Sequence, residues 1–157
     1  MTKEQEHWDS VIKQINPIEP HYDGWLDKYF DKLPDTELHI VELGCGWGDD
    51  TSFLSKKGYD VVSCDFSDAA INIIKNLYPT VKTSQFNLLD GLPFPTGSIQ
   101  VVVADLCLHY FTAADTEMII AEIYRPFYKV INRRKFQSYP LILYLSSITF
   151  NSARIVE

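Results

Sequence analysis

The apolar positions of the chain follow two different periods, and the change falls at about residue 37. Up to that point apolar residues recur at helical spacing, which predicts two amphipathic helices, at 3–15 and 22–33, separated by the breaker-rich segment NPIEP. Beyond it, short apolar runs alternate with helical stretches, a pattern typical of a parallel sheet covered by helices on both faces. We therefore predict one domain, with a helical cap at 1–36 and an α/β core at 37–157.

The core pattern predicts strands joined by helical crossovers. Strands are expected at 38–43, 59–65, 81–86, 99–106 and 140–147, and helices at 50–57, 68–77 and 113–124. Ser67 stands where it can cap the second of these helices, and Pro126 is expected to disturb the continuation of the third. The predicted fold class is α/β, with a doubly wound, mainly parallel sheet.

The charge of the chain limits its partners. At a formal net charge of -7, the chain of 157 residues lacks the clustered Lys and Arg that a nucleic acid or an anionic membrane surface would require. No apolar run approaches the roughly 20 residues that span a bilayer, and the first residues, MTKEQEHWDS, do not resemble a signal peptide. We expect a cytoplasmic protein that binds neither nucleic acid nor membrane.

The cysteines indicate no special chemistry. Cys45, Cys64 and Cys107 lie at or near the ends of predicted strands and show no C-x-x-C spacing. Buried, reduced thiols are the favoured interpretation, and no metal site is predicted.

The most informative segment is HIVELGCGWGDDT, residues 39–51, which holds three glycines within five residues. A predicted strand runs into this loop and a predicted helix leaves it. Missing Cβ atoms let a ligand approach the backbone, and a helix N-terminus presents free N–H groups. The arrangement is therefore typical of an anchor for an adenosine-bearing cofactor, and a tight turn without a ligand is the alternative.

The acids around the loop narrow the choice of cofactor. A G-x-G-x-x-G loop that holds a pyrophosphate would place its third glycine at Asp49, and Glu42, Asp49 and Asp50 would repel an anionic group. S-adenosylmethionine carries a sulfonium and an ammonium group, so an acid-rich loop suits it better than it suits a nicotinamide dinucleotide. Asp65 stands where a ribose-binding carboxylate belongs, and its two oxygens can accept from both ribose hydroxyls. A helix-capping role for Asp65 is the weaker alternative, because Ser67 is available as the cap.

Further segments extend this pattern: VELGCGWG, VVSCDFS, NLLDGLPFPTGSIQVVVADLCLHYF and EIYR. In order and spacing, from about Leu38 to Arg125, they resemble the motifs of class I S-adenosylmethionine-dependent methyltransferases, particularly those of the small-molecule type. The resemblance implies a Rossmann-like fold, S-adenosylmethionine as cofactor, S-adenosylhomocysteine as product and a small-molecule methyl acceptor. It makes the core at 37–157 the cofactor-binding part.

The resemblance assigns roles to the loop and to the second strand end. It implies that Glu42 organises the loop and that Gly44, Cys45 and Gly46 line the methionine moiety. Asp65 would bind the ribose.

Roles also follow for residues at the later strand ends. Phe66 would lie against the adenine. Asn87, where many relatives have Asp, would lie near the adenine amino group, and the backbone N–H of Leu88 would face a ring nitrogen. Asp105 and Leu106 would lie beside the methionine portion and the transferred methyl group.

Methyl transfer is an in-line displacement at an activated carbon, so alignment and exclusion of water matter more than a strong acid or base. His109 is the best candidate to face the acceptor and remove its proton, and packing at the mouth of the pocket is the alternative. A candidate aromatic lid consists of Trp8, Tyr22, Trp25, Tyr110 and Phe111. Core packing of the N-terminal helices explains the same residues at least as well.

The chain departs from the family pattern after EIYR. Relatives continue with a turn rich in Pro and Gly and add a helix and an antiparallel hairpin after the fifth strand, whereas this chain has PFYKVINRRKFQSYP and stops soon after that strand. We therefore expect a fold that lacks the C-terminal strand hairpin and leaves the fifth strand as an exposed apolar edge. The open alternatives are a homodimer through that edge, a shortened member that methylates poorly, and coverage by the tail SITFNSARIVE.

The leading functional hypothesis is an S-adenosylmethionine-dependent methyltransferase that acts on an unidentified small molecule. A cofactor-binding or interaction module with little or no turnover is the alternative, motivated by the shortened C-terminus. A nicotinamide-dependent oxidoreductase is a weaker third hypothesis, because Asp49 interrupts the glycine pattern that it requires.

Overall fold

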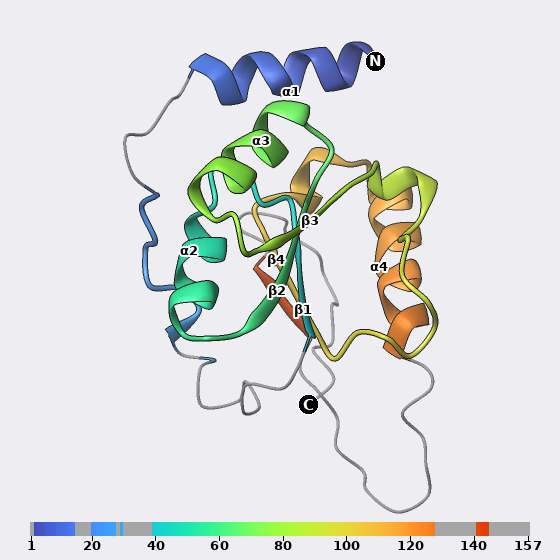
Figure 1. Cartoon of the computed structure of the whole chain (residues 1–157). Coiled ribbons are helices and arrows are strands. Elements are labelled where there is room, and N and C mark those ends of the chain that lie inside the picture. Colours follow the sequence, from blue (N-terminus) through green and yellow to red (C-terminus); the bar gives the residue numbers. More distant parts are fainter. Residues whose placement is uncertain (1, 15–19, 28, 30–38, 128–140, 145–157) are drawn as a thin grey trace, which may run out of the picture.

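The computed structural model describes residues 2–14, 20–27, 29, 39–127 and 141–144 (Figure 1). The helices and strands of these residues are α1 (Lys3–Gln14), β1 (His39–Leu43), α2 (Asp49–Lys56), β2 (Asp60–Asp65), α3 (Asp68–Leu77), β3 (Lys82–Gln85), the short 3-10 helix η2 (Leu88–Asp90), β4 (Val101–Asp105), a second short 3-10 helix η3 (Leu108–Tyr110), α4 (Ala113–Phe127) and β5 (Leu141–Tyr144). None of the helices in these ranges is both long and apolar enough to cross a membrane.

The strands form one sheet in the order β3-β2-β1-β4-β5, and every neighbouring pair is parallel. The predicted doubly wound parallel sheet is therefore confirmed. The order reverses at β1, because β2 and β3 extend the sheet on one side and β4 and β5 on the other. In sheets of this kind the ligand crevice lies outside the carboxyl ends of the strands at the point of reversal.

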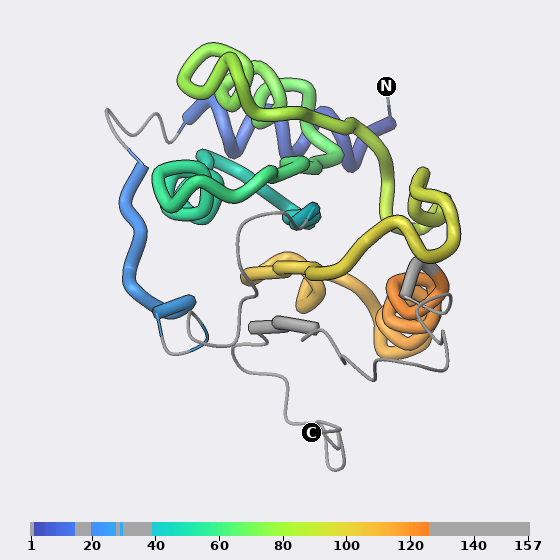
Figure 2. The backbone as a smooth tube through the Cα atoms, turned by 60° about the horizontal axis from the view of Figure 1, so that its bottom comes forward, coloured from blue at the N-terminus to red at the C-terminus, as the bar shows by residue number. Residues whose placement is uncertain are grey.

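Consecutive residues of the central strands pack against opposite faces of the sheet. Val102 of β4 is fully buried in a cluster with Ile119 of α4. Val103, the next residue, is equally buried in a second cluster with Leu54 of α2. Because side chains alternate along a strand, α2 and α4 cover the two faces, as Figure 1 shows. α1 packs against α3 through Ile12 and lies next to that helix in both views (Figures 1 and 2).

Most predicted elements of the core form where the sequence placed them. α3 begins and ends at the predicted residues, and the side chain of Ser67 accepts a hydrogen bond from the Ala70 N–H (3.2 Å), which confirms the predicted cap. β5 pairs with β4 over Leu141–Tyr144, while residues 140 and 145–147 of the predicted strand lie outside the described ranges. The expected lack of a hairpin also falls on residues outside them, so the homodimer through β5 stays a prediction.

The predicted second helix, at 22–33, is wrong for the residues that the structure describes. Tyr22 and Asp23 are not helical, and Gly24–Leu26 form a bend and turn followed by 3-10 geometry. Gly24 has a φ of 87°, and the Trp25 N–H bonds to the Asp23 carboxylate (3.1 Å) instead of a helical carbonyl. Local side-chain bonds of this kind compete with a helix, and the sequence periodicity does not register them. Residues 28 and 30–33 are outside the described ranges.

The expected effect of Pro126 is also wrong in part. α4 continues past residue 124 and through Pro126 to Phe127. Proline lacks an N–H, so one carbonyl of the preceding turn loses its helical partner. Because Pro126 lies in the last turn, the helix loses only this one bond and can continue to Phe127.

All three cysteines are free thiols, with Cys45 and Cys64 buried and Cys107 half-buried. Burial raises the pKa of each thiol, which keeps them protonated at neutral pH. The expectation of buried, free thiols is confirmed for Cys45 and Cys64, whereas Cys107 is half-buried.

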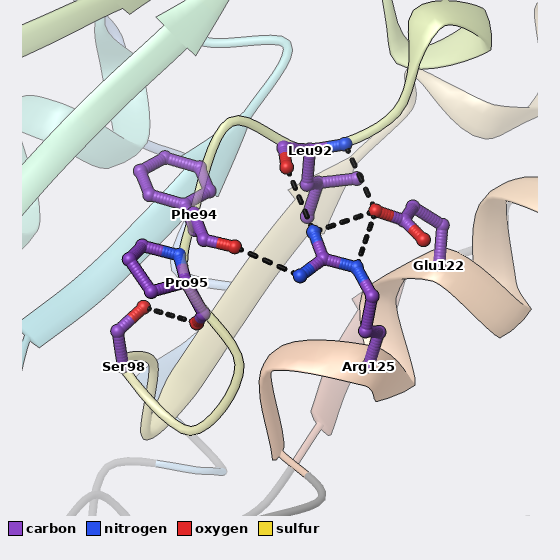
Figure 3. Close-up of polar contacts among 6 residues, drawn as sticks. All are labelled: Leu92, Phe94, Pro95, Ser98, Glu122 and Arg125. Atoms are coloured by element: carbon purple, nitrogen blue, oxygen red, sulfur yellow. Dashed lines mark hydrogen bonds and ion pairs between the residues drawn. The ribbon is translucent and has the colours of Figure 1, made fainter.

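A polar clamp fastens the turn before β4 to α4, and it involves the EIYR segment (Figure 3). The Arg125 guanidinium donates from Nη2 to the Leu92 carbonyl (2.8 Å), from Nη1 to the Phe94 carbonyl (3.0 Å) and from Nε to Glu122 Oε1 (2.7 Å). The same Glu122 oxygen accepts from the Leu92 N–H (3.3 Å). The clamp therefore satisfies backbone groups of a turn that lacks regular structure.

We predict that Arg125→Ala lowers the urea concentration at the midpoint of unfolding, because two carbonyls and the Glu122 carboxylate lose their donor. Urea unfolding followed by circular dichroism measures the change. Glu117→Ala is the matched control, since Glu117 is exposed on the same helix. Equal unfolding midpoints for the two variants would show that the clamp contributes nothing.

Candidate functional site

A cavity of about 660 Å³ opens at the carboxyl ends of the strands where the sheet order reverses. Every residue predicted to contact the cofactor lines this cavity: Glu42, Gly44, Cys45, Gly46, Asp65, Phe66, Asn87, Leu88, Asp105 and Leu106. They come from the ends of different strands, so the topology of the sheet brings them together. The volume lies in the range of sites for small molecules and cofactors.

The glycine loop lies close to two other strand ends. The N–H groups of Gly44 and Cys45 both donate to the Cys64 carbonyl at the end of β2 (2.8 and 2.9 Å). Gly44 has a φ of 73°, and a Cβ on it would stand 2.5 Å from the Cys107 Cβ, so only glycine fits there. Gly46, with a φ of 48°, has open space where its Cβ would be. A ligand can therefore approach the backbone at Gly46.

Glu42 connects three elements below the loop. Its side chain is buried and accepts hydrogen bonds from the Thr51 N–H (3.2 Å), the Thr51 hydroxyl and the Ser63 hydroxyl (2.9 Å). Burial raises the pKa of Glu42 to about 8, in spite of these donors. Glu42 therefore joins β1 to the first turn of α2 and to β2, and near neutral pH it takes up a proton.

Asp65 is held in a fixed direction at the cavity wall. Its Oδ2 accepts from the Gly46 N–H (3.0 Å) and its Oδ1 from the Ser67 N–H (2.8 Å). Each carboxylate oxygen keeps acceptor capacity for a further donor. The bond from Ser67 shows that Asp65 also supports the start of α3, although the side-chain cap itself is Ser67. Burial raises the pKa of Asp65.

The acids of the cavity lack basic partners. No Lys, Arg or His occurs among the described residues that line it. Burial, together with neighbouring acids, raises the pKa of Asp50 to about 7 and that of Asp105 to about 6. Asp50 accepts from the Trp25 indole N–H (2.9 Å), whereas Asp105 Oδ1 is buried with no hydrogen-bond partner in the described part of the chain. A ligand with a cationic donor would relieve both the repulsion and this unpaired oxygen.

The opposite end of the cavity is lined by Phe66, Asn87 and Leu88. The Asn87 side-chain oxygen accepts from the Leu89 N–H (3.0 Å) and so caps η2. The Phe66 carbonyl accepts from Gln5 of α1 (3.4 Å) and from the side chain of the last residue of β3 (3.3 Å). Phe66 is thus held through its backbone carbonyl, which leaves its ring available to a ligand, and Asn87 is held through its side-chain oxygen.

The N-terminal helix forms one wall of the cavity, and the sequence interpretation did not identify this wall as a whole. Its lining residues are Glu4, Trp8, Val11 and Ile12. The Trp8 ring meets the Tyr110 ring edge-to-face at 4.5 Å, which joins α1 to η3 across the mouth. The spacing of these four positions corresponds to one face of a helix, and this signal was available in the sequence.

The other candidate residues divide between the cavity and the core. Tyr110 and Phe111 line the cavity, whereas Tyr22 and Trp25 pack in the core cluster that contains Leu54. His109 is not among the lining residues, and its ring lies 3.9 Å from that of Tyr110. Its catalytic role stays a prediction.

Leu106 has a strained backbone at the rim of the cavity. It is the one non-glycine residue with positive φ (47°) in the described ranges, and its side chain is 43% exposed. Such strain persists where the surrounding structure enforces it, and it is frequent at ligand sites.

A family model described as a methyltransferase domain matches residues 40–127, more than half of the chain. The chain belongs to this methyltransferase-domain family. The matched range begins in β1 and ends with α4, so it contains all the strand ends whose described residues line the cavity.

Individual relatives of the methyltransferase domain agree with this assignment. An uncharacterised methyltransferase of Synechocystis is 33% identical over 86 residues, which cover 55% of this chain and 40% of that protein. The magnesium-protoporphyrin O-methyltransferase of Rhodobacter capsulatus is 32% identical over 96 residues, 59% of this chain and 43% of that protein. The chain thus spans less than half the length of these relatives.

Solved structures show the same fold. The structure of a TehB-like SAM-dependent methyltransferase from Corynebacterium glutamicum superposes with a TM-score of 0.55 at 24% identity. The superposition covers 77% of this chain and 63% of that one. At this level of identity the likeness supports the Rossmann-like fold of the methyltransferase domain.

The two glycines of the loop predict different costs of substitution. Gly44→Ala should lower the free energy of unfolding by at least about 3 kcal/mol, because it adds a clash with Cys107 to the left-handed backbone. At Gly46 the added Cβ would have open space around it, so Gly46→Ala should lower the free energy of unfolding only through backbone strain, by about 1–2 kcal/mol. Thermal and urea unfolding of both variants measures the difference, and similar losses would contradict the close contact.

The buried Glu42 predicts a pH dependence of stability. Its folded-state pKa, about 8, lies above the ordinary value of 4.5, so the native state binds the extra proton and stability falls as pH rises from about 4.5 to 8. Glu42→Gln keeps the size and acceptor oxygen of the side chain and should remove this loss of stability. The difference should be clearest between pH 7 and 8, because the pKa values of Asp50 and Asp105, about 7 and about 6, do not exceed that window. Urea unfolding across this pH range provides the test. A parallel pH profile in the variant would show that Glu42 does not titrate in this window.

Proposed function

We propose that this chain carries out S-adenosylmethionine-dependent methyl transfer to a small-molecule acceptor. The observation that carries the proposal is the cavity at the reversal point of the sheet, with a glycine loop open at Gly46 and acidic walls without a basic residue among its described lining. Membership of the methyltransferase-domain family supports it. The acceptor is a small organic molecule whose identity the proposal leaves open.

The residues present fit this cofactor. Asp65 keeps free acceptor capacity for the ribose hydroxyls, and Phe66 offers an aromatic face to the adenine. Asn87 and Leu88 are at hand for the edge of the base. Asp105 Oδ1, which has no hydrogen-bond partner among the described residues, is the acceptor to which we assign the ammonium group.

The loop and the remaining acids complete the binding site. Gly44, Cys45 and Gly46 line the cavity, and the open space at Gly46 leaves room for the methionine portion. Glu42 holds the loop in place through Thr51. Leu106 lines the cavity, and we assign it a place beside the transferred methyl group.

S-adenosylmethionine supplies a methyl group on a sulfonium, a carbon that is already activated for in-line displacement. The chain therefore has to align the reactants and exclude water. Trp8 and Tyr110, whose rings are in contact, both line the cavity, and the described lining is rich in apolar side chains. We assign removal of a proton from the acceptor to His109, which does not itself line the cavity but lies in η3 next to the lining residue Tyr110.

A cofactor-binding module without turnover remains the second hypothesis, and no observation in the described residues favours it. The expectation behind it concerns the segment after α4, and most of that segment lies outside the described residues. Product formation with any acceptor at more than one turnover per molecule would exclude it.

The direct test is isothermal titration with S-adenosylmethionine and S-adenosylhomocysteine. We expect binding at micromolar concentrations, and Asp65→Ala should weaken it by at least about tenfold, because two hydrogen bonds from the ribose to a charged acceptor are lost. Glu117→Ala, which removes an exposed carboxylate from α4, is the control and should bind as the unmodified chain does.

Two results would contradict the proposal. Absence of binding for both compounds at high micromolar concentrations rejects the cofactor. Unchanged affinity of Asp65→Ala, with binding in the unmodified chain, removes Asp65 from the site.

A further inference from the structure

The N-terminal helix is bonded to the turn that follows Asp65. Asp9 of α1 is 6% exposed, and its Oδ1 accepts hydrogen bonds from the Ser67 hydroxyl and from the Ala69 N–H (3.2 Å). One helical turn earlier, Gln5 donates to the Phe66 carbonyl (3.4 Å). α1 therefore contacts both residues that directly follow Asp65.

Ser67 continues these bonds toward the glycine loop. Its side chain is fully buried, and its hydroxyl oxygen accepts from the Ala70 N–H (3.2 Å) while its proton is donated to Asp9. Its backbone N–H donates to Asp65 Oδ1 (2.8 Å), and Asp65 Oδ2 accepts from the Gly46 N–H (3.0 Å). A continuous series of hydrogen bonds thus leads from α1 to the loop.

Packing alone does not account for an acid at position 9. Ile12 already provides apolar contact between α1 and α3, through Ala69 and Ala70. A carboxylate buried at such an interface is unfavourable unless donors satisfy it, and an apolar residue would pack there without that requirement. What Asp9 adds is a fixed orientation for the Ser67 hydroxyl, which would otherwise be a buried donor without a partner.

α1 also contacts the glycine loop and η3 at the cavity. Trp47, next to Gly46, donates from its indole to the Ile12 carbonyl (3.2 Å), and Trp8 meets Tyr110 at the mouth. Docking of α1 therefore fixes the turn after Asp65 and the glycine loop together.

We propose that Asp9 is a positioning residue for cofactor binding, which acts through Ser67 to hold Asp65 and Phe66 in the orientation that receives the adenosine portion. The inference rests on the proposed function, since it assumes that this cavity binds S-adenosylmethionine. Asp9 does not line the cavity, so its contribution to affinity is indirect.

The first experiment compares variants at position 9 by isothermal titration with S-adenosylhomocysteine and with adenosine. Asp9→Ala should raise the Kd of both compounds by about tenfold, because the adenosine portion is common to them and is the part that Asp65 and Phe66 hold. Asp9→Asn keeps an acceptor oxygen for Ser67 and Ala69 and should stay within about threefold of the unmodified chain. Glu6→Ala, an exposed position on α1, is the matched control and should not change either Kd.

The second experiment asks whether Ser67 transmits the effect. Ser67→Ala and the double variant Asp9→Ala/Ser67→Ala complete a double-mutant cycle, measured below the unfolding temperature of each variant as found by calorimetry. If Asp9 acts through the Ser67 hydroxyl, the double variant should bind about as weakly as the weaker single variant. A general loss of α1 packing would instead give losses that add.

Three results separate the proposals. If the unmodified chain binds and the Kd of Asp9→Ala lies within twofold of the Kd of the unmodified chain, the role of Asp9 is overturned and the proposed function is not. Additive losses in the cycle, or equal weakening by Asp9→Asn and Asp9→Ala, overturn the route through Ser67. Absence of any binding by the unmodified chain contradicts the proposed function itself.

Discussion

The close approach of Gly44 to Cys107 is the constraint on which the rest of the site depends. A Cβ at Gly44 would stand 2.5 Å from the Cys107 Cβ, so the backbone after β1 can come this near to the segment after β4 only because glycine occupies the position. The Gly44 and Cys45 N–H groups are bonded at the same time to the Cys64 carbonyl of β2. The ends of the three strands are thereby fixed around one cavity, and each of them brings an acid to its wall.

Acids buried at close range to one another are electrostatically unfavourable. Glu42, Asp50 and Asp105 all have raised pKa values because they are buried and because further acids lie nearby. In a fold optimised for stability alone, such groups would be paired with cations or replaced by apolar side chains. Their arrangement around a cavity that also contains an unpaired carboxyl oxygen agrees with a site that is completed by a cationic ligand.

Much of this arrangement could be predicted from local patterns in the sequence. The parallel sheet, the limits of α3 and the cap at Ser67 follow from hydrophobic periodicity and helix-start signals, which act over short distances. The cofactor residues follow from motif spacing, because strand ends in a doubly wound sheet meet at a known place. In the region of Gly24, by contrast, the Trp25 and Leu26 N–H groups donate to the side chains of Asp23 and Tyr22 in place of the expected helical bonds. Periodicity does not detect such bonds.

The cavity wall formed by α1 shows a second limit of sequence interpretation. Asp9 and Ser67 are 58 positions apart, and nothing local in either segment indicates that they meet. The pairing arises only when α1 docks on α3, and through it a helix that precedes the family domain becomes part of the proposed cofactor site. Long-range contacts of this type are set by tertiary packing, so they have to be read from the structure.

A crystal structure of the chain with S-adenosylhomocysteine tests the central claim most directly. We expect the ribose hydroxyls within hydrogen-bond distance of the Asp65 carboxylate, the methionine portion over Gly44–Gly46, and the ammonium group at Asp105. A ligand bound elsewhere on the chain, or one in this cavity with Asp65 and Asp105 both turned away from it, would contradict the account.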